Sequence, residues 1–317
     1  MRSGPVAIAP RIGEPDQPRR RTAKAAAEPG SANRYAAEVA HPLLDAHDLR
    51  GPIESHLRAI GRVFRVFDHQ DSGCVSYGVA IAAERWFVKS SATDAAAASL
   101  RRAIALHAAV QHPAIIPLRS VIEAEGQPIL VQPWVDGEVL YHATAPSAPA
   151  PALRRSDPAS AISRFRREPV PAVERVLDDI VDAHVAVARA GFVAVDFYDG
   201  CVIYDFATRR AALCDLDEYR PGPFTVDGER LPGSTRYMAP EEHQRGAPID
   251  ERTTAFNLGR AIRLLLDAGD DERAWRGTPE QLAVVAHATR ELPSERYSTV
   301  AALAAAWRSA RRHASDR

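Results

Sequence analysis

Hydrophobic and polar residues alternate in different ways along the chain, and the first clear pattern predicts a sheet. Residues 51–70 indicate a short helix followed by strand-like alternation, and residues 74–91 indicate a pair of strands. Residues 95–110 are rich in Ala and place larger apolar residues near helical spacing, which predicts one helix. Residues 114–135 then predict two strands around a turn at 123–127. We therefore expect a mainly antiparallel sheet with one helix inserted after its third strand.

The second half of the chain has a mostly helical pattern. Apolar residues recur on one face of residues 172–191, which predicts an amphipathic helix that ends at Gly191. Short strands are predicted next, at residues 192–196, 201–206 and 210–219. Later helices include residues 256–269 and 299–312. The order of these elements predicts an α+β fold, with a small sheet-containing part before a larger helical part.

Two segments lack a periodic pattern. Residues 1–48 consist largely of Ala, Pro, Gly and Arg, with a basic cluster at residues 19–24, and bury too little apolar surface to offset their ordering entropy. We predict a disordered basic arm there, with a docking arm for an acidic partner as the alternative, and a folded domain over residues 49–317. Within that domain, residues 142–171 are of low complexity and predict an exposed insertion.

Composition narrows the class of protein. With 317 residues, 46% of them hydrophobic, the chain can form a substantial core, and its formal net charge of −1 gives no electrostatic reason to expect nucleic acid as a partner. Its cysteines, Cys74, Cys201 and Cys214, have neither disulfide-framework nor zinc-site spacing. No apolar run reaches the roughly 18 residues of a membrane helix, and the first residues lack the apolar stretch of a signal peptide. We expect a cytoplasmic protein without a membrane span.

Residues 233–241, Gly-Ser-Thr-Arg-Tyr-Met-Ala-Pro-Glu, form the most specific motif of the chain. The motif resembles the end of the activation segment of protein kinases, which reads G-T-x-x-Y-M-A-P-E. Because of this motif, the chain resembles the eukaryotic-like (bacterial) Ser/Thr protein kinases. The resemblance covers about residue 61 to the C-terminus. It implies a bilobal protein-kinase-like fold, with a small antiparallel-sheet lobe at about 61–135 and a larger, mainly helical lobe at about 136–317.

The resemblance also implies the residues that carry the chemistry. Asp196 stands in the place of the catalytic-loop aspartate that accepts the proton of the substrate hydroxyl. Asp215, followed by Leu216 and Asp217, stands where the family has D-F-G, so it would bind Mg²⁺ or Mn²⁺. Lys89 ends a Trp-Phe-Val-Lys sequence that resembles V-A-I-K, so it would bind the α and β phosphates of ATP and serve catalysis.

Further matches imply how ATP would be held. Gly73 and Val75 match the closing G-x-V of the glycine-rich loop that covers the phosphates. Residues 129–137 resemble the strand and hinge between the lobes, where adenine would bond to the carbonyl of Pro133 and the backbone of Val135. Phe87 replaces a small alanine, so its ring would either narrow the nucleotide pocket or stack on the base.

Several positions depart from the family pattern. Tyr198 replaces a lysine that would stabilise the transferring phosphoryl group. Cys201 replaces the metal-binding asparagine, and a thiol is a poor ligand for Mg²⁺, so Asp199 or Asp217 would have to substitute. Ala103 stands where the family has the glutamate that pairs with the lysine. This departure leaves Lys89 either unpaired or partnered by Asp215.

One resemblance concerns the scaffold. Arg296, at the end of a Pro-Ser-Glu-Arg sequence, would form a buried ion pair with Glu241 of the activation segment. Loss of either partner of such a pair costs about 3–5 kcal/mol.

Three functions follow from these observations. The first is transfer of the γ-phosphate of ATP to a protein Ser or Thr hydroxyl, which requires ATP, a divalent cation and a protein substrate. The second is a pseudokinase that binds nucleotide or partner proteins without turnover, as the changes at Ala103, Tyr198 and Cys201 would allow. The third is a small-molecule phosphotransferase of the antibiotic or choline kinase type, against which the motif at 233–241 argues, because that class lacks an activation segment.

Overall fold

The computed structural model describes residues 40–68, 72–141 and 154–315, and residues 40–317 form one compact unit. Most of the predicted arm, residues 1–39, lies outside the described residues. The predicted boundary at residue 48 is wrong, because Leu43 is fully buried and the next residues enter the sheet. The ordered unit therefore begins at about residue 40.

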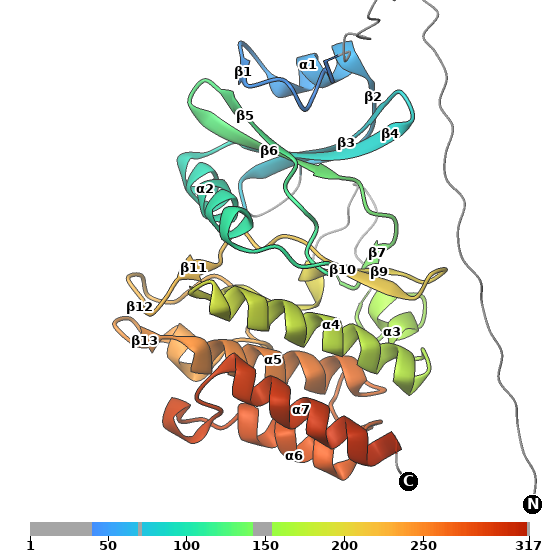
Figure 1. Ribbon diagram of the computed structural model, residues 1–317, viewed down its shortest axis with the longest axis vertical. Helices are drawn as coiled ribbons and strands as arrows, with labels where there is room; N and C mark the ends of the chain where they lie inside the picture. Colours follow the sequence, from blue (N-terminus) through green and yellow to red (C-terminus); the bar gives the residue numbers. More distant parts are fainter. Residues whose placement is uncertain (1–39, 69–71, 142–153, 316–317) are drawn as a thin grey trace, which may run out of the picture. The chain divides into compact units, whose positions relative to one another are not determined.

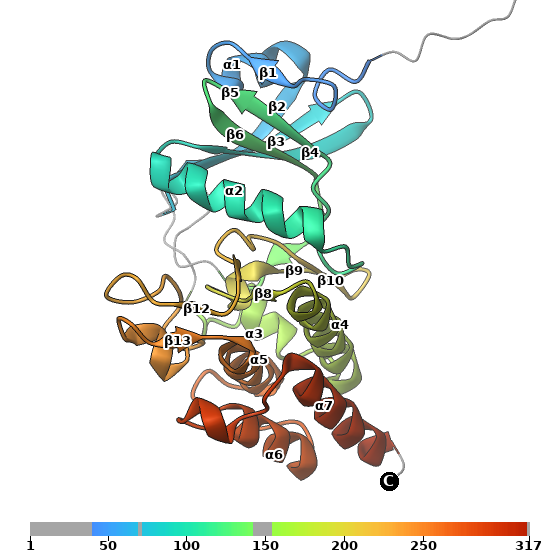
Figure 2. The same ribbon diagram turned by 60° about the vertical axis from the view of Figure 1, so that its left-hand side comes forward.

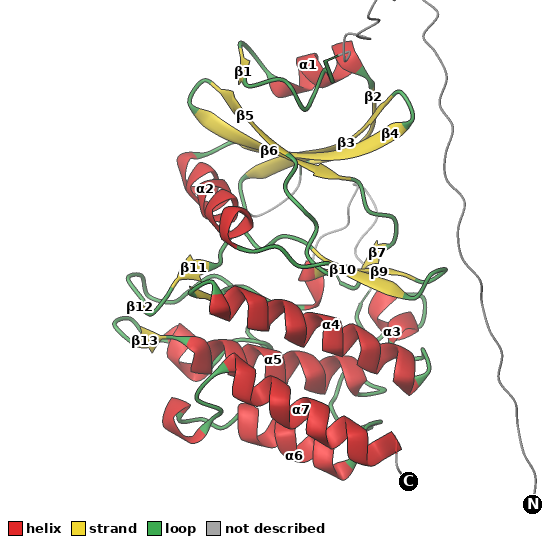
Figure 3. Ribbon diagram, in the orientation of Figure 1, coloured by secondary structure: helices red, strands yellow, loops and turns green. Residues whose placement is uncertain are grey.

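Strands gather in the N-terminal half of this unit and helices in the C-terminal half (Figure 3). The largest sheet of the described residues has six strands in the order β1-β5-β6-β4-β3-β2, all antiparallel except the β1–β5 pair (Figure 1). Its strands are β1 (Asp48–Leu49), β2 (Arg62–Phe67), β3 (Cys74–Ile81), β4 (Glu84–Ser91), β5 (Ser120–Ala124) and β6 (Gln127–Pro133). The fold is thus mixed α+β, as the order of elements predicts.

The described residues hold seven α-helices, which include those predicted from periodicity. They are α1 (Ile53–Ile60), α2 (Asp94–Ala109), α3 (Ala161–Phe165), α4 (Val170–Arg189), α5 (Glu251–Leu266), α6 (Pro279–Ala288) and α7 (Val300–Ser315). None of these helices is both long enough and apolar enough to cross a membrane.

The two faces of the six-stranded sheet pack against different partners. One face carries Val79 and Val88 and forms a hydrophobic core with Leu43, Ile53 and Leu57, from α1 and the residues before it. Helix α2 lies along the opposite face (Figure 2) and packs its apolar side on β4 and β6. The side chain of Thr93 caps α2 by accepting a hydrogen bond from the backbone of Ala96 at 3.1 Å.

Helices α4, α5 and α7 build the larger core around residues such as Leu177, Leu265 and Trp307. Short strands lie between β6 and α5 and make small two- and three-stranded sheets. They are β7 (Glu138–Val139), β8 (Phe192–Val193), β9 (Val202–Asp205), β10 (Arg210–Leu213), β11 (Arg220–Pro221), β12 (Phe224–Thr225) and β13 (Pro248–Ile249). The hairpin of β9 and β10 brings residues 196–201 and 213–217 together.

The prediction of an exposed insertion at residues 142–171 is wrong for its second part, which contains the buried helix α3. Residues 142–153 lie outside the described residues, but α3 follows, with Ile162 and Phe165 fully buried. Phe165 packs edge-on against Tyr204, with ring centroids 4.8 Å apart. Two apolar residues at helical spacing are enough to dock this helix, although small and polar neighbours conceal them in the sequence.

The predicted ion pair between Glu241 and Arg296 is confirmed. Two nitrogens of the buried Arg296 guanidinium donate to the two carboxylate oxygens of Glu241, at 2.6 and 2.9 Å. Thr253 donates its hydroxyl to the same carboxylate at 2.8 Å. The pair joins the end of the predicted activation segment to α5 and to the loop before α7.

Candidate functional site

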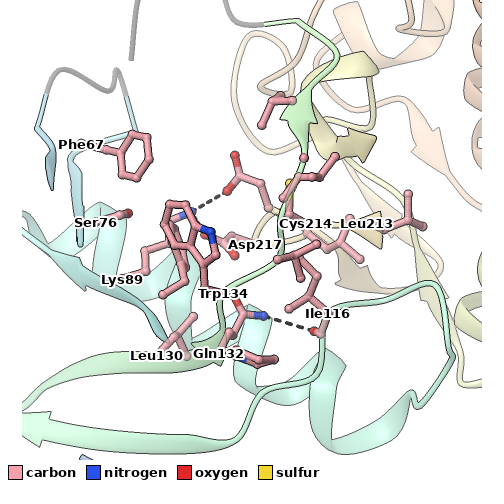
Figure 4. Close-up of a pocket in the computed structure, with 18 of the residues that line it drawn as sticks. Phe67, Ser76, Lys89, Ile116, Leu130, Gln132, Trp134, Leu213, Cys214 and Asp217 are labelled. Carbon is pink, nitrogen blue, oxygen red and sulfur yellow. Dashed lines mark hydrogen bonds and ion pairs between the residues drawn. The ribbon is translucent and has the colours of Figure 1, made fainter. Parts of the chain in front are cut away.

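A cavity of about 340 Å³ lies between the six-stranded sheet and the hairpin of β9 and β10. Apolar residues dominate its wall, and Ser76, Lys89 and Asp217 lie near one another at one end (Figure 4). The sheet contributes residues of β2, β3, β4 and β6, and the opposite wall includes Gly200, Ile203 and residues 213–217. A concave, largely apolar pocket with a few convergent polar groups is the usual form of a small-molecule site.

Lys89 lies at the polar end, where its ammonium group pairs with two carboxylates. It donates to Asp215 at 2.5 Å and also to Asp217, and the side chain of Lys89 is only 8% exposed. Burial disfavours the ammonium, but the charges of Asp215 and Asp217 outweigh burial and hold the pKa of Lys89 well above its usual range. The expectation that Lys89 has at most Asp215 as a partner is therefore wrong, because Asp217 shares it.

Asp196 lies beside this cluster. Burial, and then the charge of Asp215, raise the pKa of Asp196 to about 7, although Lys89 and the backbone N–H of Ser234 act in the opposite direction. Its φ of 59° and the φ of 56° at Asp215 are both left-handed. Few residues other than Gly adopt this conformation, and such residues cluster at functional sites. The carboxyl group is thus poised to exchange a proton near neutral pH.

Cys201 connects Asp196 to Asp215. Its buried thiol donates to the backbone carbonyl of Asp196 at 3.3 Å and, more weakly, to that of Asp215 at 3.8 Å. Burial raises the pKa of this thiol well above its usual range, so it stays protonated. A protonated thiol in contact with two carbonyls is not a ligand for a hard cation, which agrees with the departure noted in the sequence.

Asp199, one of the two substitute metal ligands expected from the sequence, is already engaged. Its side chain is fully buried and forms an ion pair with Arg155, from the segment before α3. The guanidinium of Arg155 also stacks on the ring of Tyr141, with 3.6 Å between its central carbon and the ring centroid. The described residues contain no group of three or more His, Cys, Asp or Glu side chains arranged to hold a metal ion. A cation would need further oxygens from its ligand or from water.

Helix α2 is linked to the site by an ion pair that does not involve Lys89. Ala103 is buried against the sheet and offers no charge to Lys89. The neighbouring Arg102 reaches instead to Glu218 at 2.6 Å, directly after Asp217. The position of α2 is therefore coupled to the loop that carries the carboxylates.

The register of β3 and β4 shows that Gly73 and Val75, the residues predicted to cover the phosphates, do not face the cavity. Lys89 pairs with Ser76, and residues directly opposite in an antiparallel pair point to the same face. Val75 is one residue out of phase and packs in the core on the other face, while Gly73 packs against Thr93. Neither lines the cavity, whereas Ser76 does. Residues 69–71, between β2 and β3, lie outside the described residues.

The predicted hinge lines the cavity at its other end. Pro133 closes β6, and Val135 follows the strand, so the sheet does not use its backbone groups. Trp134 extends its indole beside the cavity and packs edge-on against Phe64, with centroids 4.8 Å apart. Gln132 anchors its side-chain nitrogen to the carbonyl of Ile116 at 3.2 Å, and Figure 4 shows it next to Leu130. The indole of Trp134 and backbone groups thus line one end, and Lys89 with its two carboxylate partners lies at the other.

Of the predicted site residues, Lys89, Pro133, Val135 and Asp215 line the cavity, and Asp196 lies close to Asp215 without lining it. Gly73 and Val75 lie outside the cavity. Predictions from the sequence missed Ser76 and Arg155, and alternation counted from Lys89 across the hairpin would have found Ser76. No protein-family model matches the chain, and a comparison with curated proteins found no match.

Proposed function

We propose that residues 40–317 form a bilobal domain of the protein-kinase type that transfers the γ-phosphate of ATP to a Ser or Thr hydroxyl of a protein. The observation that carries this proposal is a cavity with Lys89 and Asp215 at one end, close to Asp196, and with aromatic and aliphatic side chains along the rest of its wall. Nucleotides have this polarity, with an apolar base at one end and anionic phosphates at the other.

Each residue has a role that its surroundings support. Lys89 would donate to phosphate oxygens, and the rings of Phe87 and Trp134 would contact the base. Asp196, with its pKa raised to about 7 by burial and by Asp215, would orient the hydroxyl and accept its proton. A divalent cation, when bound at Asp215, would neutralise phosphate charge.

The motif at 233–241 supports a protein substrate over a small molecule. Ser234 contacts Asp196 through its backbone N–H, and Glu241 anchors the motif to Arg296. The turn that begins at Ser234 thus lies beside the proposed proton acceptor, where a peptide could bind.

A second candidate function is nucleotide binding without turnover. The observation that favours it is the catalytic loop itself, where Tyr198 brings no positive charge and Cys201 is tied to carbonyls. Both functions use the same nucleotide-binding site, but only the first transfers a phosphoryl group to a substrate.

The test is ATP binding followed by transfer. We expect ATP with Mg²⁺ or Mn²⁺ to raise the melting temperature of the full chain, because a ligand that binds only the folded state stabilises it. Lys89→Ala should lose this rise, whereas the exposed Arg85→Ala, which pairs with Asp136 outside the cavity, should keep it.

Transfer of labelled phosphate to the protein itself and to a mixture of protein substrates separates the two candidates. Asp196→Asn should keep the thermal shift and lose transfer by a factor of about 10²–10⁴. If the wild-type chain binds ATP but transfers no phosphate, the second candidate function, nucleotide binding without turnover, replaces the first. Absence of any nucleotide-dependent shift would reject both.

A further inference from the structure

Two carboxylates share one lysine at the polar end of the cavity. Asp215 and Asp217 are separated by Leu216, which is buried in the core of the helical half. Both carboxylates nevertheless form ion pairs with the ammonium nitrogen of Lys89, and Figure 4 shows Asp217 next to Lys89. Two anions and one cation leave this cluster with a net charge of −1.

The geometry of the cluster resembles that of a cation site. One oxygen of each carboxylate contacts the same nitrogen atom, so the two oxygens lie close together around one ammonium group. Carboxylates that bind one Mg²⁺ approach it from a similar span, with each oxygen about 2.0–2.1 Å from the metal. The ammonium group of Lys89 therefore occupies a position that a divalent cation could take.

Asp217 is the one remaining substitute for the ligand that Cys201 cannot provide. Of the two candidates from the sequence, Asp199 is fully buried and engaged by Arg155. Asp217, by contrast, lines the cavity together with Asp215. Mg²⁺ sites in nucleotide-dependent proteins commonly use one or two carboxylates, with phosphate and water oxygens completing the coordination.

Ser76 gives a second, independent indication of a ligand at this point. The residue is fully buried, lines the cavity and lies opposite Lys89 in the β3–β4 ladder. Among the described residues, its hydroxyl has no hydrogen-bond partner. A buried hydroxyl without a partner is unfavourable and is therefore uncommon. A ligand oxygen beside Lys89 would satisfy it.

We propose that Asp215 and Asp217 jointly bind one divalent cation that accompanies the phosphates of a nucleotide, and that Lys89 occupies the cation position before the ligand binds. On binding, the flexible lysine side chain moves its ammonium to the phosphate oxygens, and the hydroxyl of Ser76 bonds to the ligand beside it. The proposal rests on the proposed nucleotide site and adds Asp217, Ser76 and the exchange of one cation for another.

The first experiment uses Mn²⁺ alone, followed by the paramagnetic signal of the free ion in titrations of the full chain. Lys89→Met removes the competing ammonium, so this variant should bind Mn²⁺ at least tenfold more tightly than the wild type. The double variant Lys89→Met, Asp217→Asn should lose that gain, whereas adding Asp227→Asn, an exposed carboxylate of the following loop, should keep it. Equal affinities in the wild type and Lys89→Met would overturn the proposal.

Folding of each variant is checked by circular dichroism. If Lys89→Met does not fold, the single variant Asp217→Asn still tests the proposal. In this variant we expect ADP affinity to gain less than twofold from Mn²⁺, against at least tenfold in the wild type. The same metal-dependent gain in both would reject Asp217 as a ligand.

Ser76→Ala should weaken ADP binding severalfold with the metal dependence unchanged, and wild-type affinity in this variant would remove Ser76 from the site. If the wild type binds no ADP while Lys89→Met gains Mn²⁺, the cation site stands and the proposed function fails. The two failures are therefore distinguishable.

Discussion

Two clusters of charge in this protein are built differently, although each centres on one buried cation. The guanidinium of Arg296 matches the carboxylate of Glu241 with two parallel hydrogen bonds, and the hydroxyl of Thr253 completes it. The ammonium of Lys89 is divided between two carboxylates that border a cavity. In the first cluster the charges of one cation and one anion cancel and their hydrogen bonds are satisfied, which suits a rigid contact between two structural elements. The second has an excess anion beside an open space, which suits a site that exchanges ions.

The largest effect that we expect is at the balanced pair. Arg296→Ala leaves the carboxylate of Glu241 buried without its partner, so the free energy of unfolding should fall by about 3–5 kcal/mol. Urea unfolding followed by circular dichroism measures this change. Arg252→Ala is the control, because the pair that Arg252 forms with Asp250 is partly exposed and should contribute about 1 kcal/mol or less. If Arg296→Ala lowers the free energy of unfolding no more than Arg252→Ala does, the ion pair with Glu241 contributes little to stability.

Glu242, next to Glu241, provides an intermediate case, a buried carboxyl group without a cation partner among the described residues. Burial raises its pKa to about 7 from an ordinary value of 4.5. The unfolded chain thus releases this proton at lower pH than the folded protein. The stability that the group contributes is present below pH 4.5 and is lost as the pH rises to 7.

Glu242→Gln removes this titration and keeps an oxygen to accept from Ala239 and Asn257, which now donate to one carboxylate oxygen at 2.6 and 2.8 Å. The stability of this variant relative to wild type should increase by about 3 kcal/mol between pH 4.5 and pH 7.5. Urea unfolding of both proteins at several pH values measures the difference. A difference that does not vary with pH would mean that Glu242 ionises normally in the folded protein.

The smallest effect should occur at the unbalanced cluster. Asp217→Asn removes the excess anion and leaves Lys89 paired with Asp215, so no buried charge loses its only partner. We expect the free energy of unfolding to change by less than about 1 kcal/mol. A loss as large as that of Arg296→Ala would place Asp217 in the scaffold and remove the contrast between the two clusters.

Helical periodicity and specific motifs made much of this structure predictable. The apolar stripe of α4 and the Ala-rich α2 were apparent because a long amphipathic helix repeats its signal over several turns. The pairing of Glu241 with Arg296 was predictable from motif order, since both residues belong to recognisable sequences.

Features that depend on register or on one contact were not predictable. A shift of one residue exchanges the two faces of a strand, so a motif match centred on Val75 concealed the cavity-facing Ser76. Strand β1 has two residues and forms by pairing with β5, which no local pattern signals. The ion pair of Arg155 with Asp199 joins a low-complexity segment to the predicted catalytic loop, and composition indicates only that such a segment is polar.

The indole of Trp134 has a spectroscopic consequence. The chain contains four tryptophans, all within the described residues, and Trp134 alone among them lines the cavity. Trp86 and Trp307 are buried in separate hydrophobic cores, and Trp275 packs against the core of the helical half. Emission from those three should stay constant when a ligand enters, whereas the emission of Trp134 should change. The protein therefore carries a built-in optical reporter, and no dye is needed to follow binding.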